Sequence, residues 1–311
     1  MANGSIIVDT GKQIIINRAY KATPDYLVPT QFKVGISNST PDVGDTDLDV
    51  AIPIDNGTIN DDGSNTGNLV GSAGGTTSTD NITRFKPGGG TSDVTAQNLL
   101  ANGTSVSKTW TIANLAAAGS VMTLTNPFGV WIYMDETAVY DLLAAAGTVF
   151  DIRFRTTGDG ATLYYQYVRT KAQLAAGWNW ITSGTTIMTG LTQGAGGPPS
   201  GVCDEVVLII TTAAAGTTFS AGECVWDLLR DWAESDLVKD YISGYPTIDE
   251  TSFEVETRCQ LVSTEANGFD LNGFGNFNKD ASILLSGEDT FTAESKSNTD
   301  QFTFIVKDRL I

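Results

Sequence analysis

The sequence predicts an all-β protein of two parts: a β domain built jointly by both ends of the chain, and a jelly-roll β-sandwich inserted between them. Short runs of β-branched and aromatic residues recur along the chain, and Gly, Ser, Thr and Asn fill the spaces between them. The 33 glycines suit the many turns of such a fold. A length of 311 residues leaves room for two domains.

The composition argues against several classes of function. Thirty-six acidic residues against 18 basic ones give a net charge of −18, which repels nucleic acid and anionic membrane surfaces. The chain has no histidine, which is the usual general base of nucleophilic catalysis and the commonest zinc ligand. No apolar run reaches the roughly 18 residues of a membrane span, and the first residues lack a secretory signal pattern. We therefore expect a non-enzymatic protein that binds no nucleic acid and does not insert into a membrane.

The N-terminal part, residues 1–54, predicts strands separated by turns. Residues 5–17 place two isoleucine-rich segments around a turn that contains glycine, which is typical of a β-hairpin. Residues 32–36 alternate as a strand does, and residues 48–54 return to alternating apolar positions.

Residues 55–78 are nearly free of large apolar side chains and predict a linker. Residues 79–246 form the predicted insert. Its strand-like runs number about eight, as a jelly roll requires. They are residues 105–112, 121–125, 128–134, 149–156, 162–168, 178–181, 205–212 and 223–228.

One or two short helices are expected in the insert. Asp135 or Thr137 can cap a helix that stops at Gly147. Residues 231–242 carry apolar side chains at helical spacing, and a Gly-Tyr-Pro sequence that ends at Pro246 follows them.

Residues 247–311 return to β texture, with a closing strand predicted at residues 301–307. Two or three strands alone make a marginal sheet, whereas the two ends together provide about six or seven. We therefore predict that residues 32–54 pair with residues 253–278 in one sheet.

Motifs in both ends resemble those of bacteriophage virion proteins. The sequence FKVGISNSTPDVGDTDL at residues 32–48 is similar to a phrase of tail-fibre and collar proteins that dock on the phage baseplate. The sequence ANGFDLNGFGNF at residues 266–277 is similar to the companion phrase of the same small domain. The resemblance implies a docking domain whose motif residues are Phe32, Val34, Gly35, Pro41, Asp45, Thr46, Leu48, Ala266, Asn267, Gly268, Phe274, Gly275 and Phe277.

This resemblance implies a virion structural protein that docks through its terminal domain at the tail, collar or baseplate and displays the insert outward. Capsid decoration is an alternative location. The implied partners are other virion proteins, and many copies or a symmetric homo-oligomer are expected. The protein would be assembled into the particle in the cytoplasm of the host bacterium.

The insert resembles jelly-roll modules of the carbohydrate-binding type. The resemblance lies in FGVWIYMD at residues 128–135, LAAGWNW at residues 174–180 and VWDLLR at residues 225–230. Some of these modules bind glycans on aromatic platforms, and some hold a structural calcium ion. The resemblance implies host surface glycans as an alternative partner and calcium as the one candidate cofactor.

Trp178 and Trp180 share one face of their strand, and Asn179 points the other way. The two tryptophans are therefore either both core residues or a paired platform for a sugar. Asp227 is a candidate ligand for calcium, which prefers oxygen donors.

Other reactive groups predict little chemistry. Cys203 and Cys224 are either buried free thiols or a bridge that needs oxidising surroundings. Adjacent carboxylates such as Asp135 and Glu136 face opposite ways on a strand, so such a doublet cannot alone form the acid–base pair of a glycosidase. A glycosidase is the third hypothesis, and we expect the protein to show no hydrolysis of polysaccharides.

Overall fold

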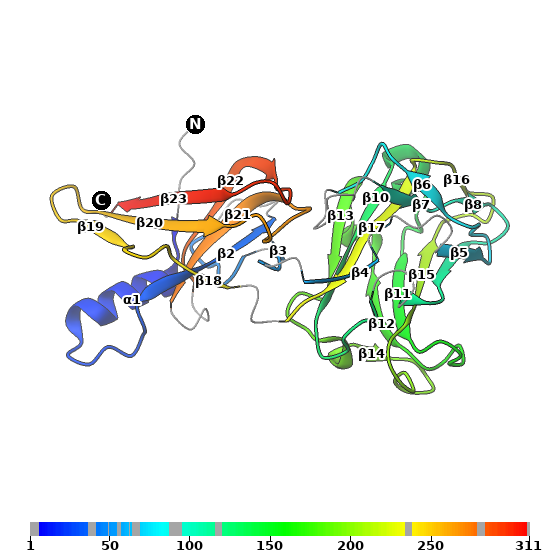
Figure 1. Cartoon of the computed structure of the whole chain (residues 1–311), viewed down its shortest axis with the longest axis horizontal. Coiled ribbons are helices and arrows are strands. Elements are labelled where there is room, and N and C mark those ends of the chain that lie inside the picture. Colours follow the sequence, from blue (N-terminus) through cyan, green and yellow to red (C-terminus); the bar gives the residue numbers. More distant parts are fainter. Residues whose placement is uncertain are drawn as a thin grey trace. The chain divides into compact units, whose positions relative to one another are not determined.

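The computed structural model describes residues 6–36, 42–48, 50–54, 57–61, 63, 69–86, 95–115, 120–233, 238–278 and 284–309. The protein is all-β, with several antiparallel sheets and few short helices (Figure 1). It forms two compact units: the terminal unit, residues 1–56 with 234–311, and the inserted unit, residues 57–233. None of the helices in the described ranges has the length and apolar character needed to cross a membrane.

The two ends of the chain share one sheet in the terminal unit. Strand β2 (Pro29–Ile36) pairs antiparallel with β21 (Asp270–Asn278), which places Phe32 opposite Asn276 and Val34 opposite Phe274. Figure 1 shows β2, in blue, beside β21, in orange. The predicted pairing is confirmed for these two strands, whereas residues 254–261, which were predicted to join the same sheet, lie in a second sheet. The sheet order is β1-β22-β21-β2-β18 with β3 beside β2, and the other strands are β1 (Ile6–Ile7), β3 (Val50–Ala51), β18 (Lys239–Asp240) and β22 (Leu284–Ser295).

A second sheet of the terminal unit has the order β19-β20-β23. Its strands are β19 (Thr247–Asp249), β20 (Glu254–Leu261) and β23 (Phe302–Arg309). Phe274 of β21 stacks on Phe32 of β2, at 5.7 Å between ring centroids, and on Phe304 of β23, at 5.3 Å. This aromatic stack joins the two sheets of the unit.

Helix α1 (Asp9–Tyr20) occupies most of the segment predicted as a β-hairpin, so that prediction is wrong. Asp9 in its first turn and Arg18 in its last turn each suit the helix dipole. The three consecutive isoleucines point in different directions: Ile14 is buried and Ile16 is 60% exposed. A continuous apolar run has no period of its own, so it did not distinguish a strand from a helix.

The inserted unit is a jelly-roll β-sandwich. One sheet, the first sandwich sheet, has the order β13-β10-β17-β7-β6 with β4 beside β17; the second has the order β14-β12-β11-β15-β9-β5. Along the chain, β7, β9, β10 and β11 alternate between the sheets, β11 and β12 form a hairpin, and β13, β15 and β17 alternate again. These eight strands, four in each sheet, form the predicted jelly roll, and β4, β5, β6 and β14 extend its sheets.

The elements of the inserted unit are as follows. The strands are β4 (Thr58–Asp61), β5 (Leu69–Ser72), β6 (Thr79–Asn81), β7 (Ala96–Asn98), β8 (Ala101–Asn102), β9 (Ser107–Ile112), β10 (Phe128–Met134), β11 (Phe150–Arg155), β12 (Tyr165–Arg169), β13 (Gly177–Thr182), β14 (Thr192–Gln193), β15 (Glu205–Thr211), β16 (Thr218–Phe219) and β17 (Cys224–Asp231). The short helices are a π-helical turn η1 (Glu136–Tyr140) and two 3₁₀ turns, η2 (Lys171–Gln173) and η3 (Met188–Gly190).

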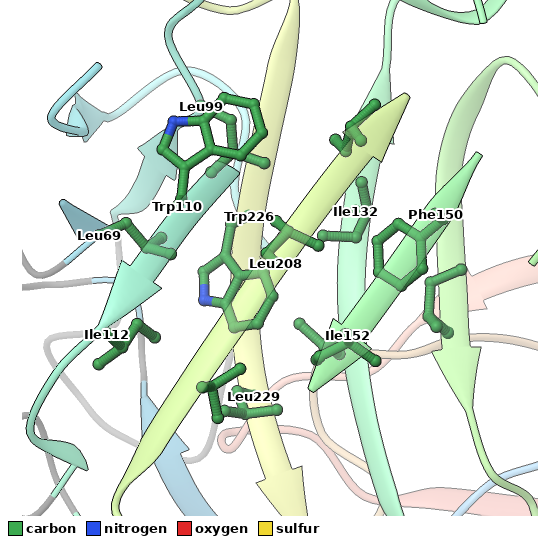
Figure 2. Packing of buried hydrophobic residues seen from close by; sticks show 14 of the residues in the cluster. Leu69, Leu99, Trp110, Ile112, Ile132, Phe150, Ile152, Leu208, Trp226 and Leu229 are labelled. Atoms are coloured by element: carbon green, nitrogen blue, oxygen red, sulfur yellow. The ribbon is translucent and has the colours of Figure 1, made fainter. Parts of the chain in front are cut away.

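The core of the inserted unit lies between its two sheets. Figure 2 shows side chains from both sheets converging, with Ile132 from β10, Leu208 from β15 and Trp226 from β17. The indole Nε1 of Trp226 donates a hydrogen bond of 2.9 Å to Asp61 Oδ2, so this core tryptophan has a polar partner.

The segment predicted as a linker, residues 55–78, contributes strands to both sandwich sheets. Strand β4 pairs with β17, and β5 pairs with β9. Asn60 is fully buried and its amide donates to Asp231 Oδ2 at 3.1 Å. The composition suggested a linker because burial here is achieved by hydrogen-bonded polar side chains, which a hydrophobicity argument does not detect.

The other boundary and the helices also differ from prediction. The inserted unit ends at Ala233 and not at residue 246, because Lys239–Asp240 form β18 on the terminal sheet. Asp135 caps η1 as predicted, accepting from the Thr137 and Ala138 amides, but the turn ends at Tyr140. Residues 231–242 form no helix in their described part, where Asp231 ends β17 and Lys239–Asp240 form β18, and residues 234–237 lie outside the described ranges.

Candidate functional site

Five aromatic side chains gather on the outer face of the first sandwich sheet. We call them the aromatic face: Trp131, Tyr133, Trp178, Trp180 and Trp232. Alternation along β10 sends Ile132 into the core and its neighbours outward. The register of β10 with β13 then places Trp131 opposite Trp180 and Tyr133 opposite Trp178.

The rings of the aromatic face contact one another at different angles. The centroid of Trp131 lies 5.2 Å from that of Trp180 and 6.2 Å from that of Trp178. Trp180 also stacks on Trp232 at 6.1 Å. Trp131 and Trp232 are only 3% and 1% exposed, whereas Trp178, Trp180 and Tyr133 are half-buried. Two buried tryptophans therefore support three rings that reach the surface.

Three cations lie against these rings. Lys86 Nζ is 4.4 Å from the centroid of Trp131, and Arg84 Cζ is 4.0 Å from that of Tyr133. Arg230 Cζ is 5.8 Å from the centroid of Trp180. Lys86 and Arg230 are buried, and Arg84 is half-buried. Contacts of this kind hold the rings in place.

Asn179 points away from the aromatic face, as predicted, and holds the turn that leads into β13. Its Oδ1 accepts from the Ala175 amide at 2.8 Å, and its Nδ2 donates to the Ala175 carbonyl at 2.9 Å. The alternation therefore fixes Trp178 and Trp180 on one side. Neither tryptophan belongs to the core cluster between the sheets.

Gly129 of β10 sets the position of Trp180. A Cβ atom at Gly129 would lie 2.1 and 2.2 Å from two ring atoms of Trp180. We expect Gly129→Ala to displace this ring and to lower the free energy of unfolding of the inserted unit by about 1–3 kcal/mol. Urea titration followed by tryptophan fluorescence measures both effects. The matched control is Gly160→Ala, because nothing lies within 4 Å of a Cβ there. Equal stability of the two variants would contradict the close packing described here.

The calcium candidate Asp227 lies in β17, opposite Trp131, and is fully buried. Its Oδ2 accepts a hydrogen bond of 2.6 Å from the Lys86 amide. Within the described ranges, no three histidine, cysteine or carboxylate side chains come together in a group suited to a metal ion. Asp227 therefore holds the backbone at Lys86, whose Nζ lies over the ring of Trp131.

Cys203 and Cys224 are buried free thiols, which is one of the two predicted alternatives. Burial raises the pKa of each thiol. A buried thiol with a raised pKa is unreactive in the folded protein.

The docking motif residues lie largely in the interior of the terminal unit. Phe32, Val34, Phe274 and Phe277 are at most 1% exposed, and they build the core around β2 and β21. Their burial makes these four side chains part of the framework of the terminal unit, and the docking role of that unit stays a prediction. The buried motif residues also include Ala266, Asn267, Gly35, Gly268 and Gly275. Asp45 and Leu48 are half-buried, and Thr46 is exposed. Pro41 lies outside the described ranges.

The terminal unit contains an apolar pocket that no local sequence pattern predicts. The pocket has a volume of about 280 Å³, and its lining includes Ile14, Ile15 and Arg18 of α1 together with Pro246 and Val255. These residues come from segments far apart in the chain, so only the folded structure brings them together.

A chain of buried polar groups runs beside the pocket. The Tyr241 hydroxyl donates to Asn276 Oδ1 at 2.9 Å, and Asn276 Nδ2 donates to Ser286 Oγ at 3.0 Å. Ser286 Oγ donates in turn to Asp308 Oδ2 at 3.1 Å. Burial raises the pKa of Tyr241, so this hydroxyl stays a donor at neutral pH.

Comparison with known proteins gives one structural likeness. No protein-family model matches the chain, and no curated protein matches it. A solved structure from a study of carbohydrate-binding modules of the β-sandwich superfamily is similar at a TM-score of 0.35 and 12% identity, covering 67% of this chain and 86% of that one. The sandwich assignment for the inserted unit follows from its own strand pairing.

Proposed function

We propose that this chain is a non-enzymatic structural protein of a bacteriophage particle. The terminal unit attaches to other particle proteins, and the inserted jelly roll is displayed. The observation that carries this proposal is the geometry of the insertion: Thr58, in the first strand of the inserted unit, pairs with Asp231, in its last. The two ends of the inserted unit therefore lie next to each other, as an inserted domain requires.

The terminal unit supports the attachment role through its construction. Both segments that resemble phage docking domains, residues 32–48 and 266–277, contribute to its framework, and β2 and β21 are paired in it over most of their length. A tail, collar or baseplate position follows from that resemblance. Capsid decoration is the alternative position, because a capsid decoration protein would also need an attachment domain and a displayed module.

Purification of particles tests the proposal. The chain is given an affinity tag in the genome that encodes it, and phage particles are separated on a density gradient. We expect the tag to sediment with intact particles and to appear at one location by immunogold labelling. A chain found only in the soluble fractions would refute the structural role, and labelling at the tail or at the head decides between the two positions.

A second candidate function, binding of host surface glycans, is favoured by the aromatic face. Trp178, Trp180 and Tyr133 reach the surface side by side, and aromatic rings stack on the apolar faces of sugars. The positive charge of Arg84 over Tyr133 adds a polar contact at the edge of the face.

Glycan-array binding tests this second function. We expect Trp178→Ala to weaken binding by about tenfold or more, which corresponds to about 1.4 kcal/mol. The matched control is Tyr164→Ala, because Tyr164 is an aromatic residue outside the aromatic face with a cation, Arg153, over its ring at 4.5 Å. Absence of binding by the unaltered chain would remove the hypothesis, and equal losses in both variants would show that the aromatic face is not the site.

A further inference from the structure

We propose that the terminal unit pairs with a second copy of the chain, Phe253 of each copy entering the apolar pocket of the other. The inference rests on the proposed assembly function and deepens it, because it names one partner and the surface that meets it. Four features of the terminal unit carry it: an exposed aromatic side chain, an apolar pocket, opposite charges around the two, and their closeness on one unit.

Phe253 is the protruding group. It lies at the end of the loop between β19 and β20 and is 65% exposed. Its φ of +56° falls in the left-handed region, which a bulky side chain rarely adopts and which costs about 1–3 kcal/mol. The loop is held by Asp249, whose Oδ1 accepts from the Thr251 amide at 2.8 Å. A strained backbone that presents an aromatic ring to solvent is typical of a contact residue.

The pocket can receive such a ring. Its volume of about 280 Å³ exceeds the roughly 150 Å³ at which an apolar cavity already binds benzene. Ile14, Ile15 and Val255 give it apolar walls. Entry of the ring removes apolar surface from water on both partners, which favours association.

The charges around the two features are complementary. The loop that carries Phe253 also carries Asp249 and Glu250, both exposed. Hydrogen bonds from Ser252 and the Thr251 amide lower the pKa of Asp249, so that carboxylate is charged at neutral pH. Exposed Arg18 lies at the pocket and donates to the Tyr26 carbonyl at 2.8 Å.

Several other charged side chains near the two features have partners within the unit. Lys12 and Lys21 of the α1 region pair with Asp9 and Asp25, and Glu254 pairs with Lys307. Asp308, which also lines the pocket, accepts from Ser286. Asp308 keeps its negative charge but is half-buried, so Arg18 is the exposed charge of the pocket lining that the acidic loop meets.

The closeness of the two features favours a closed pair. Pro246 and Val255, at the base of the β19–β20 hairpin, line the pocket, and Phe253 lies only two residues before Val255. When a protruding group and its receptor lie next to each other on one unit, a two-fold axis lets both copies insert at once. The predicted product is a dimer.

Sedimentation of the full chain at increasing concentration tests the pairing. We expect the unaltered chain to form dimers, and we expect Phe253→Ser to raise the dissociation constant by at least tenfold. Ile305→Ser is the matched control, because Ile305 is a 54% exposed apolar residue on another strand of the same sheet. A monomer at every concentration, or equal dissociation constants for the unaltered chain and Phe253→Ser, would overturn the inference.

A cross-linking experiment tests the location of the contact. Mixed under mild oxidation, Phe253→Cys and Ile15→Cys are expected to form a disulfide between chains, whereas Phe253→Cys and Thr303→Cys are not. The native cysteines are buried and do not compete. Failure of the first pair to cross-link would overturn the proposed contact. A monomeric chain that still sediments with phage particles would overturn the pairing alone, and a dimer missing from particles would overturn the assembly function alone.

Discussion

Trp226→Ala is expected to lower the free energy of unfolding of the inserted unit by about 3–5 kcal/mol. Trp226 is fully buried between the two sandwich sheets, so its removal leaves a cavity that rigid strands on both sides cannot close. It also removes the indole donor to Asp61 Oδ2. Trp226→Phe keeps a smaller aromatic ring and loses that donor, so a smaller loss of about 1–3 kcal/mol is expected.

The buried thiols allow this loss to be assigned to one unit. Cys203 and Cys224 lie in the inserted unit and Cys259 in the terminal unit, and all three are buried and free. Urea titration with iodoacetamide labelling, read by peptide mass spectrometry, should show Cys203 and Cys224 of Trp226→Ala reacting at lower urea, with Cys259 unchanged. A simultaneous shift of Cys259 would show that the two units unfold as one body.

Phe274→Ala is expected to destabilise the terminal unit by a similar amount, about 3–5 kcal/mol. Phe274 is 1% exposed and lies between Phe32 and Phe304, so the change removes both ring contacts and the link between the two sheets. Cys259 is the reporter here, because it lies opposite Phe304 in the pairing of β20 with β23.

For Phe274→Ala we expect Cys259 to be labelled at lower urea while tryptophan fluorescence keeps its midpoint. All six tryptophans belong to the inserted unit, so their fluorescence does not follow the terminal unit. Ile305→Ser, at an exposed position of the same unit, is the control and should leave Cys259 protected. An unchanged Cys259 in Phe274→Ala would show that the aromatic stack is not the core of this unit.

Strands rich in apolar and aromatic side chains were predictable, and strands buried through polar contacts were not. Phe128–Met134 was predicted at its observed bounds. Strand β7 was missed, because its buried Gln97 and Asn98 are satisfied by side-chain hydrogen bonds, such as the one of 2.6 Å from Ser78 Oγ to Gln97 Oε1. Conversely, residues 121–125 were predicted as a strand, but only Met122 makes an isolated bridge, to Cys203.

The aromatic face was predictable in part. Alternation alone places Trp178 and Trp180 on one side of their strand. Their contact with Trp131 depends on the register between β10 and β13, and the approach of Lys86 depends on a segment distant in sequence. Neither is encoded in a local pattern. The pocket beside α1 was unpredictable for the same reason, and also because the sequence favoured a hairpin where the helix lies.

The pairing of Thr58 with Asp231 has a consequence for how such a chain can evolve. Because the first and last strands of the inserted unit are neighbours, recombination that replaces the coding segment for residues 57–233 need only supply another module whose two ends lie side by side. The sheet shared by β2 and β21 contains no residue of that segment. A lineage could thus change the surface it shows to its surroundings while the part that both termini build is inherited unaltered.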